Sequence, residues 1–209
     1  MKTVRDACQL QPNALSVKLS DQIEQLDELI SSEGDGTAFF EKTHITQGMQ
    51  DLITEGIARL SGHSSQAIFH LKQAMGGGKT HLLVGFGLLA KHSALRQIYA
   101  AGIAYADAFG SANIAAFNGR NNPDHFFWGE IANQLGKGEQ FRTFWNSGPK
   151  APDEKDWLQL FEGDQPVLIL LDEMPPYFHY SVVFVPKLSM GNLFVCEVSP
   201  FTAKHSCFI

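Results

Sequence analysis

The stretch that decides the fold is residues 73–80, which read Gln-Ala-Met-Gly-Gly-Gly-Lys-Thr. An apolar run, residues 67–71, comes before it, and residues 79–91 continue it with the composition of a helix. A glycine-rich turn between a buried strand and a helix can point backbone N–H groups at phosphate oxygens, and the helix adds the positive end of its dipole. These residues therefore predict a Walker A phosphate-binding loop.

Each residue type of this loop has a role in the prediction. Gly76, Gly77 and Gly78 permit positive φ angles and a close approach of the backbone to the phosphates. Lys79 can reach the β- and γ-phosphates and so also act in catalysis, and the Thr80 hydroxyl can ligate Mg²⁺. The first glycine of the usual G-x-x-x-x-G-K-[ST] pattern is replaced by glutamine at position 73, which changes the exit from the strand and leaves the phosphate cradle in place.

A second motif ends the strongest strand signal of the chain. Residues 166–171 read Pro-Val-Leu-Ile-Leu-Leu, and Asp172 and Glu173 follow directly. At the end of a Walker B strand the Asp holds the Mg²⁺ shell and the next Glu polarises the attacking water. We therefore predict Asp172 as a metal ligand and Glu173 as a catalytic residue. We also expect this strand to lie beside the strand of residues 67–71.

Weaker patterns complete the fold prediction. A helix is expected behind an N-cap at Thr46, and others over residues 126–135 and after Asp153. A strand is expected over residues 112–117, closed by Asn118 and Gly119. Alternating strands and helices predict an α/β domain, a P-loop NTPase of the additional-strand, catalytic-glutamate class, with a mainly parallel sheet and helices on both faces.

The chain divides by pattern into three parts. Residues 1–60 form an N-terminal helical segment, residues 61–179 the P-loop NTPase core, and residues 180–209 an atypical tail. The tail offers apolar runs without a clear amphipathic helix. Two interpretations of it stay open: a final strand pair, or a domain cut short after the Walker B strand, for example by a frameshift.

Composition excludes several classes of function. The formal net charge of the 209 residues is -6, so we expect no direct contact of this segment with nucleic acid. Three widely spaced cysteines suggest neither a zinc site nor a disulfide framework. The N-terminus lacks the apolar core of a signal peptide, and the longest apolar stretch is too short to span a bilayer. We expect a cytoplasmic protein without a membrane partner.

Several polar and aromatic residues near the motifs fit structural roles better than a ligand role. They are the turn residue Asn118, the two histidines at positions 70 and 81, and the aromatic run of residues 126–128. No arginine follows Arg142, so the region beyond the Walker B strand cannot supply an arginine finger. Arg120 is the arginine closest to the expected mouth of the cleft.

With both motifs placed, the chain resembles a family of large bacterial AAA-type ATPases catalogued as a domain of unknown function, number 499. The resemblance covers about residues 38–178 and rests on residues 39–43, 46–48, 75–81, 116–119, 128–132 and 167–174. It implies the N-terminal part of a longer ATPase of the kind often encoded near restriction or anti-phage systems. Its partners would be nucleotide, further copies of the chain, or proteins of a defence system.

The expected function is ATP binding, with Mg²⁺-dependent hydrolysis in the full-length form and weak turnover in this one. The lack of a guanine-reading Asn-Lys-x-Asp motif favours ATP over GTP. Two alternatives stay open. One is a nucleotide-binding module without useful turnover, and the other is a helicase-loader-like ATPase acting on DNA.

Overall fold

The computed structural model describes residues 26, 36–72, 78–120, 126–146, 151–175, 177–178 and 206–208. The first 35 residues of the N-terminal helical segment expected over residues 1–60 fall outside this part of the chain except for Leu26, which is helical and 1% exposed. Gln73, Gly76 and Gly77 of the predicted phosphate loop also lie outside the described residues.

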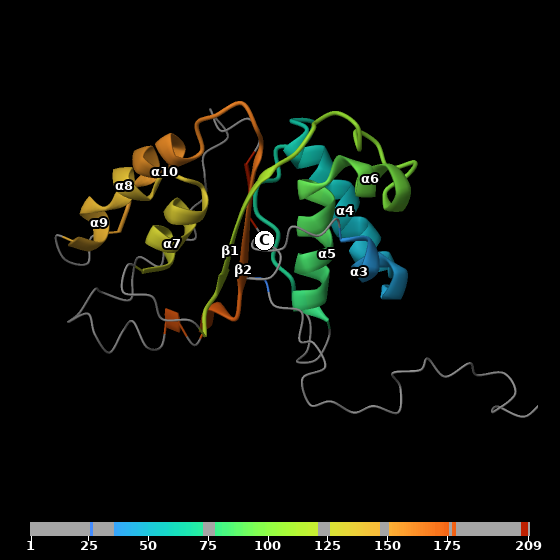
Figure 1. The fold of residues 1–209 in the computed structure, drawn as a ribbon, viewed down its shortest axis with the longest axis horizontal. Coiled ribbons are helices and arrows are strands. Elements are labelled where there is room, and N and C mark those ends of the chain that lie inside the picture. The colour runs from blue at the N-terminus through green and yellow to red at the C-terminus, as the bar shows by residue number, and fades with distance from the viewer. Residues whose placement is uncertain are drawn as a thin grey trace, which may run out of the picture.

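A parallel sheet of three strands, in the order β1-β2-β3, forms the centre of the described structure (Figure 1). Strand β1 (Asn113–Asn118) pairs with β2 (Val167–Asp172) in a register that places Asn118 opposite Asp172. Strand β3 (Ser206–Phe208) pairs with β2 at Val167 to Ile169. The expected α/β class with a parallel sheet is therefore confirmed, and β2 is the central strand.

The expectation for residues 67–71 was wrong in two respects. These residues are not the strand beside β2 in the sheet, because β1 pairs along one edge of β2 and β3 pairs along the other edge at Val167 to Ile169. They also form no buried strand: Ile68 alone makes a ladder bridge, its neighbours are half-buried, and His70 is exposed. His70 is therefore not the core histidine that a buried strand would have made it.

Helices cover both faces of the sheet (Figure 1). One face carries α3 (Thr37–Lys42), α4 (Gln47–Leu60), α5 (Lys79–Lys91) and α6 (Ser93–Tyr99). The other carries α7 (Phe126–Gln134), α8 (Gly138–Phe141), α9 (Thr143–Asn146) and α10 (Glu154–Leu160). The pleat of β2 divides its side chains between two cores: Leu168 and Leu170 join the first, and Val167 and Ile169 the second.

Helix α4 forms as its sequence pattern predicts. The Thr46 hydroxyl accepts a hydrogen bond from the Met49 N–H at 3.3 Å, and Gly62, with φ 81°, follows the helix as its stop. The apolar stripe is buried throughout, and it consists of Met49, Leu52, Ile53, Ile57 and Leu60. A Cβ on Gly56 would lie 2.3 Å from the ring of Phe86, so this glycine lets α4 pack closely on α5.

Arg96 of α6 is fully buried, which the sequence pattern did not predict. Its guanidinium donates to five backbone carbonyls, those of Leu89, Ala90, Ala106, Phe109 and Gly110. A guanidinium has five N–H donors in all, so each one has an acceptor. The side chain thereby fastens residues 106–110 to the C-terminal end of α5.

No helix within the described ranges combines the length and the apolar character that crossing a membrane requires.

Candidate functional site

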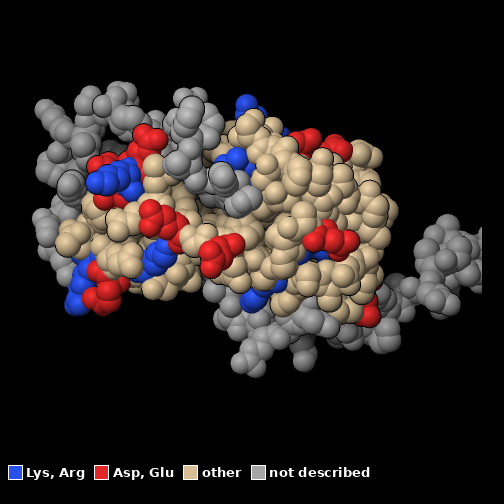
Figure 2. All heavy atoms as spheres, turned by 90° about the horizontal axis from the view of Figure 1, so that it is seen from above, with Lys and Arg blue, Asp and Glu red and all other residues tan. Residues whose placement is uncertain are grey.

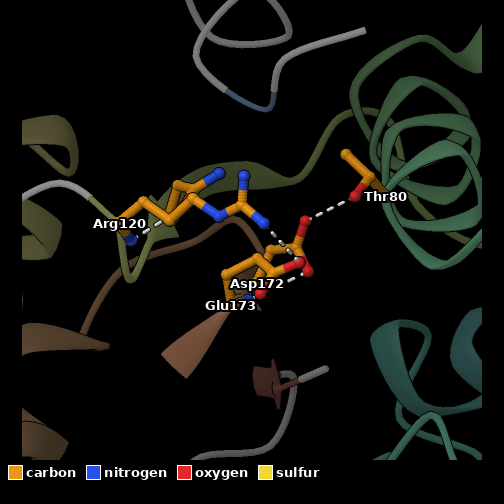
Figure 3. Close-up of polar contacts among 5 residues, drawn as sticks. Thr80, Arg120, Asp172 and Glu173 are labelled. Carbon is orange, nitrogen blue, oxygen red and sulfur yellow. Dashed lines mark hydrogen bonds and ion pairs between the residues drawn. The ribbon is translucent and has the colours of Figure 1, made fainter. Parts of the chain in front are cut away.

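Two of the predicted site residues meet where the C-terminal end of β2 faces the N-terminal end of α5. The Thr80 hydroxyl donates a hydrogen bond of 2.6 Å to Oδ2 of Asp172, which is 92 positions away along the chain (Figure 3). Asp172 is only 5% exposed, and its Oδ1 accepts from the Glu173 N–H at 3.0 Å. A hydroxyl and a carboxylate from two separate elements are thus held in direct contact.

The first turn of α5 places Lys79 beside Thr80. Gly78 precedes it with φ 75°, and a Cβ on Gly78 would meet nothing within 4 Å. The Gly78 carbonyl accepts the Leu82 N–H at 2.9 Å, so the helix is hydrogen-bonded from its first turn. A helix of 13 residues that starts at an open, left-handed glycine favours an anion at this end.

Glu173 follows β2 in a strained backbone conformation. Its φ is 51°, in the left-handed region that residues with a side chain rarely adopt. Gly119, at the end of β1, donates its N–H to the Asp172 carbonyl at 2.7 Å. A Cβ on Gly119 would lie 2.1 Å from the Glu173 carbonyl oxygen. Gly119 therefore sets the position of Glu173, a role that was not predicted from the sequence.

Arg120 contacts Glu173 and lies on the side of the site opposite Thr80 (Figure 3). Its guanidinium lies 3.5 Å from the Glu173 carboxylate, and its backbone N–H donates to Asn118 Oδ1 at 2.9 Å. The second bond closes an Asx-turn, which is the structural role expected of Asn118. The side chain of Arg120 is 71% exposed and that of Glu173 is 40% exposed, so water reaches both charges.

The comparison with protein families covers the part of this site that comes from α5. Residues 15–97 match the family model for the DUF499 N-terminal domain. The chain resembles the N-terminal part of a DUF499 protein. No curated protein and no solved structure matches it.

The DUF499 match includes Thr80 and Arg96 and ends before β1 and β2. The resemblance drawn from the sequence extended over about residues 38–178, so its part beyond residue 97 still rests on the motifs quoted above.

His81 lies inside the DUF499 match and contacts α3. Its ring stacks on Phe39 with centroids 4.5 Å apart, and its Nε2 lies 3.0 Å from Thr43 Oγ1. These contacts agree with the structural role expected of His81, and the hydrogen bond to Thr43 was not predicted. Of the aromatic run, Phe127 and Trp128 pack on the second core, which agrees with the structural role expected for them.

The donor set fits a magnesium ion of the kind that accompanies a nucleotide. Mg²⁺ is usually held by one or two carboxylates together with substrate phosphates and waters. Asp172 offers the carboxylate and Thr80 the hydroxyl, at the helix end that favours phosphates. In the described part of the chain, no three His, Cys, Asp or Glu residues form a metal centre made of protein ligands alone.

Proposed function

We propose that this chain binds ATP with Mg²⁺ at the N-terminal end of α5 and hydrolyses it slowly in this form. The observation that carries the proposal is the 2.6 Å hydrogen bond between Thr80 and Asp172. A glycine-rich loop alone is a common turn, and an apolar strand that ends in Asp is also common. Direct contact between the hydroxyl of the first and the carboxylate of the second brings both oxygens within reach of one Mg²⁺.

The residues divide the chemistry between them. Lys79 provides a point charge for the β- and γ-phosphates, and the first-turn N–H groups of α5 provide hydrogen bonds. Asp172 and Thr80 hold the metal, which neutralises charge on the phosphate oxygens when bound. Glu173, directly after Asp172, accepts a hydrogen bond from the attacking water and so orients it toward the γ-phosphate.

The architecture supports the finer assignment to a P-loop NTPase of the additional-strand, catalytic-glutamate class. Helices lie on both faces of a parallel sheet, and β3 adds a strand beside β2, which ends at Asp172 directly before Glu173. Gly76, Gly77 and Gly78 would surround the phosphates. The resemblance to DUF499 proteins is the reason for proposing that the full-length protein acts in anti-phage defence.

Titration calorimetry of Mg·ATP binding to the Lys79→Ala variant tests the proposal. We expect the affinity to fall by at least tenfold, about 1.4 kcal/mol. The matched control is Lys91→Ala, at the other end of the same helix and roughly 18 Å from position 79 by the helical rise. Affinity for Mg·ATP that stays within about threefold of the parent in Lys79→Ala would exclude this site.

A nucleotide-binding module without useful turnover is the second candidate, and two observations favour it. The Glu173 carboxylate is engaged by Arg120 at 3.5 Å, and no arginine follows Arg142 to stabilise charge in the transition state. An arginine at that point is worth roughly 10³–10⁵ in rate. Phosphate release measured over a range of protein concentrations separates the two candidates.

The DNA-loading alternative receives less support from the surface. Among the described residues on the face shown in Figure 2, lysine and arginine side chains are interspersed with aspartate and glutamate and form no continuous basic patch. A salt-dependent shift of DNA by the purified protein would favour this alternative.

A further inference from the structure

Helix α3 runs antiparallel along α5, and three contacts define this arrangement. At one end, a Cβ on Gly36 would lie 2.9 Å from Leu88 Cδ2. In the middle, the Phe39 ring would lie 3.2 Å from a Cβ on Gly85. At the other end, Thr43 contacts His81. As the residue numbers of these contacts rise along α3, those of their partners fall along α5. The last partner, His81, directly follows Thr80.

The polar contact at that end has a defined donor and acceptor. The Thr43 hydroxyl donates its proton to the Phe39 carbonyl at 2.7 Å. The same oxygen must therefore act as the acceptor toward His81 Nε2 at 3.0 Å, so Nε2 carries a proton. The His81 ring is also stacked on Phe39, with an interplanar angle of 26°. A stacked ring with one directed hydrogen bond has a fixed position as well as a packing contact.

Helix α3 depends on these contacts for its stability. It has six residues, its N-cap Gly36 makes no side-chain cap hydrogen bond, and a helix this short is unstable by itself in water. Phe40 is 3% exposed and stacks on Tyr99, so the helix is held to α5 and α6 by its aromatic residues. Anything that moves the first turn of α5 therefore acts on the docking of α3.

We propose that His81 is a positioning residue, which ties α3 to the first turn of α5 and thereby couples docking of α3 to binding of Mg·nucleotide at Thr80. This inference rests on the proposed function. Binding of a ligand to Thr80 favours one orientation of the first turn, and the Thr43–His81 hydrogen bond favours the same orientation. The coupling is reciprocal by linkage: what docked α3 adds to nucleotide affinity, bound nucleotide adds to docking of α3.

Thr43→Val tests the tie, because valine keeps the shape of threonine and removes the acceptor. Thr43→Ser is the conservative variant that retains the hydroxyl. Thr54→Val is the matched control, since the Thr54 hydroxyl also donates to the carbonyl four residues before it, at 2.8 Å, and lies on the exposed side of α4. His81→Gln keeps a side-chain N–H donor at similar reach. It should therefore keep part of the Mg·ATP affinity that Thr43→Val loses.

Two measurements are made on each variant. The first is amide hydrogen exchange of the opening turn of α5 without nucleotide, with the Leu82 N–H, bonded to the Gly78 carbonyl, as the reporter. The second is the affinity for ATP, with Mg²⁺ and with a chelator. A role that is only structural would weaken both affinities alike, whereas a role in orienting Thr80 acts on the Mg²⁺-dependent affinity.

We expect Thr43→Val to speed exchange at Leu82 and to weaken Mg·ATP binding about fivefold, the size of one hydrogen bond. ATP affinity in chelator should stay unchanged, and Thr43→Ser and Thr54→Val should behave as the parent. If the parent binds Mg·ATP and Thr43→Val matches it in both measurements, this inference alone is overturned. If the parent does not bind Mg·ATP, the proposed function falls and the coupling falls with it.

Discussion

The guanidinium of Arg120 lies 3.5 Å from the carboxylate of Glu173, in a pair that joins the turn after β1 to the end of β2. Both side chains are substantially exposed, so the pair contributes little to stability. Under the proposed function its consequence is chemical, because a carboxylate oxygen in contact with a guanidinium is less available to accept a hydrogen bond from the attacking water. Arg120 is therefore placed to restrain Glu173 in this arrangement.

Arg120→Ala is expected to change turnover without changing stability. The free energy of unfolding in urea should move by less than about 0.5 kcal/mol, because the pair is solvated. Phosphate release at low protein concentration should rise, because Glu173 is released. Arg142→Ala is the control, since Arg142 also forms an exposed ion pair, with Glu139 at 3.3 Å, and that pair does not include Glu173. Turnover that instead depends steeply on concentration in the parent and vanishes in Arg120→Ala would identify a finger acting between subunits.

Gly119→Ala is expected to damage the site through the backbone. The φ of Gly119 is not positive, so alanine is tolerated by conformation, yet its Cβ would lie 2.1 Å from the Glu173 carbonyl oxygen. Relief of that clash moves Glu173, at a cost of roughly 1–3 kcal/mol in unfolding free energy, and reduces phosphate release. Gly48→Ala, in an open position of α4, should be neutral or stabilise by up to about 1 kcal/mol. Normal turnover in Gly119→Ala would show that Gly119 does not position Glu173.

The parts of the fold with strong local signals were predictable from the sequence. Thr46 as an N-cap, the buried stripe of α4 and the strand that ends at Asp172 all depend on side chains close together in the chain. The carboxyl end of that strand also faces the start of α5, so the contact between Thr80 and Asp172 agrees with the pairing of the two motifs.

The features that the sequence did not reveal depend on backbone groups or on distant partners. Gly119 acts by the absence of a side chain beneath the Glu173 carbonyl, and any glycine in a turn looks the same in a sequence. The apolar residues 67–71 resembled a strand. A short apolar run, however, does not determine whether it joins a sheet or which strand it lies beside. In the structure β3 occupies the edge of β2 that does not pair with β1.

Asp172→Asn and Glu173→Gln should separate metal binding from water activation. Asparagine removes the charge that would hold Mg²⁺ while keeping the shape, so the gain in ATP affinity on adding Mg²⁺ should shrink. Glutamine at position 173 should leave Mg·ATP affinity within about twofold and remove the hydrolysis that the parent shows. Calorimetry with and without Mg²⁺, together with phosphate release, measures both effects. Equal hydrolysis by the parent and Glu173→Gln would remove Glu173 from the mechanism.

Arg96 provides a prediction about stability that is independent of nucleotide. Its guanidinium is 0% exposed, donates to five carbonyls, and lies 3.9 Å from the centre of the Phe109 ring. Burial lowers the pKa of Arg96 and the nearby Asp107 carboxylate opposes that shift, while the side chain keeps its charge.

Replacing Arg96 by methionine would keep an unbranched apolar stem, remove the guanidinium and leave buried carbonyls without donors. Each buried acceptor that loses its partner costs about 1–3 kcal/mol, and part of that is recovered as residues 106–110 move toward water. We expect a net loss of at least roughly 3 kcal/mol in unfolding free energy for Arg96→Met, as for other buried charges whose network is broken.

Arg96→Lys discriminates the hydrogen-bond network from the charge alone. Lysine retains the positive charge, but its compact ammonium has three donors and cannot reach carbonyls that span Leu89 to Gly110. We expect the free energy of unfolding in urea to fall in Arg96→Lys by more than half of its fall in Arg96→Met. Hydrogen exchange of the Ala112 N–H, which is bonded to the Ala90 carbonyl, should be faster in both variants. A lysine variant as stable as the parent would mean that charge suffices and that the five-donor geometry does not hold residues 106–110 to α5.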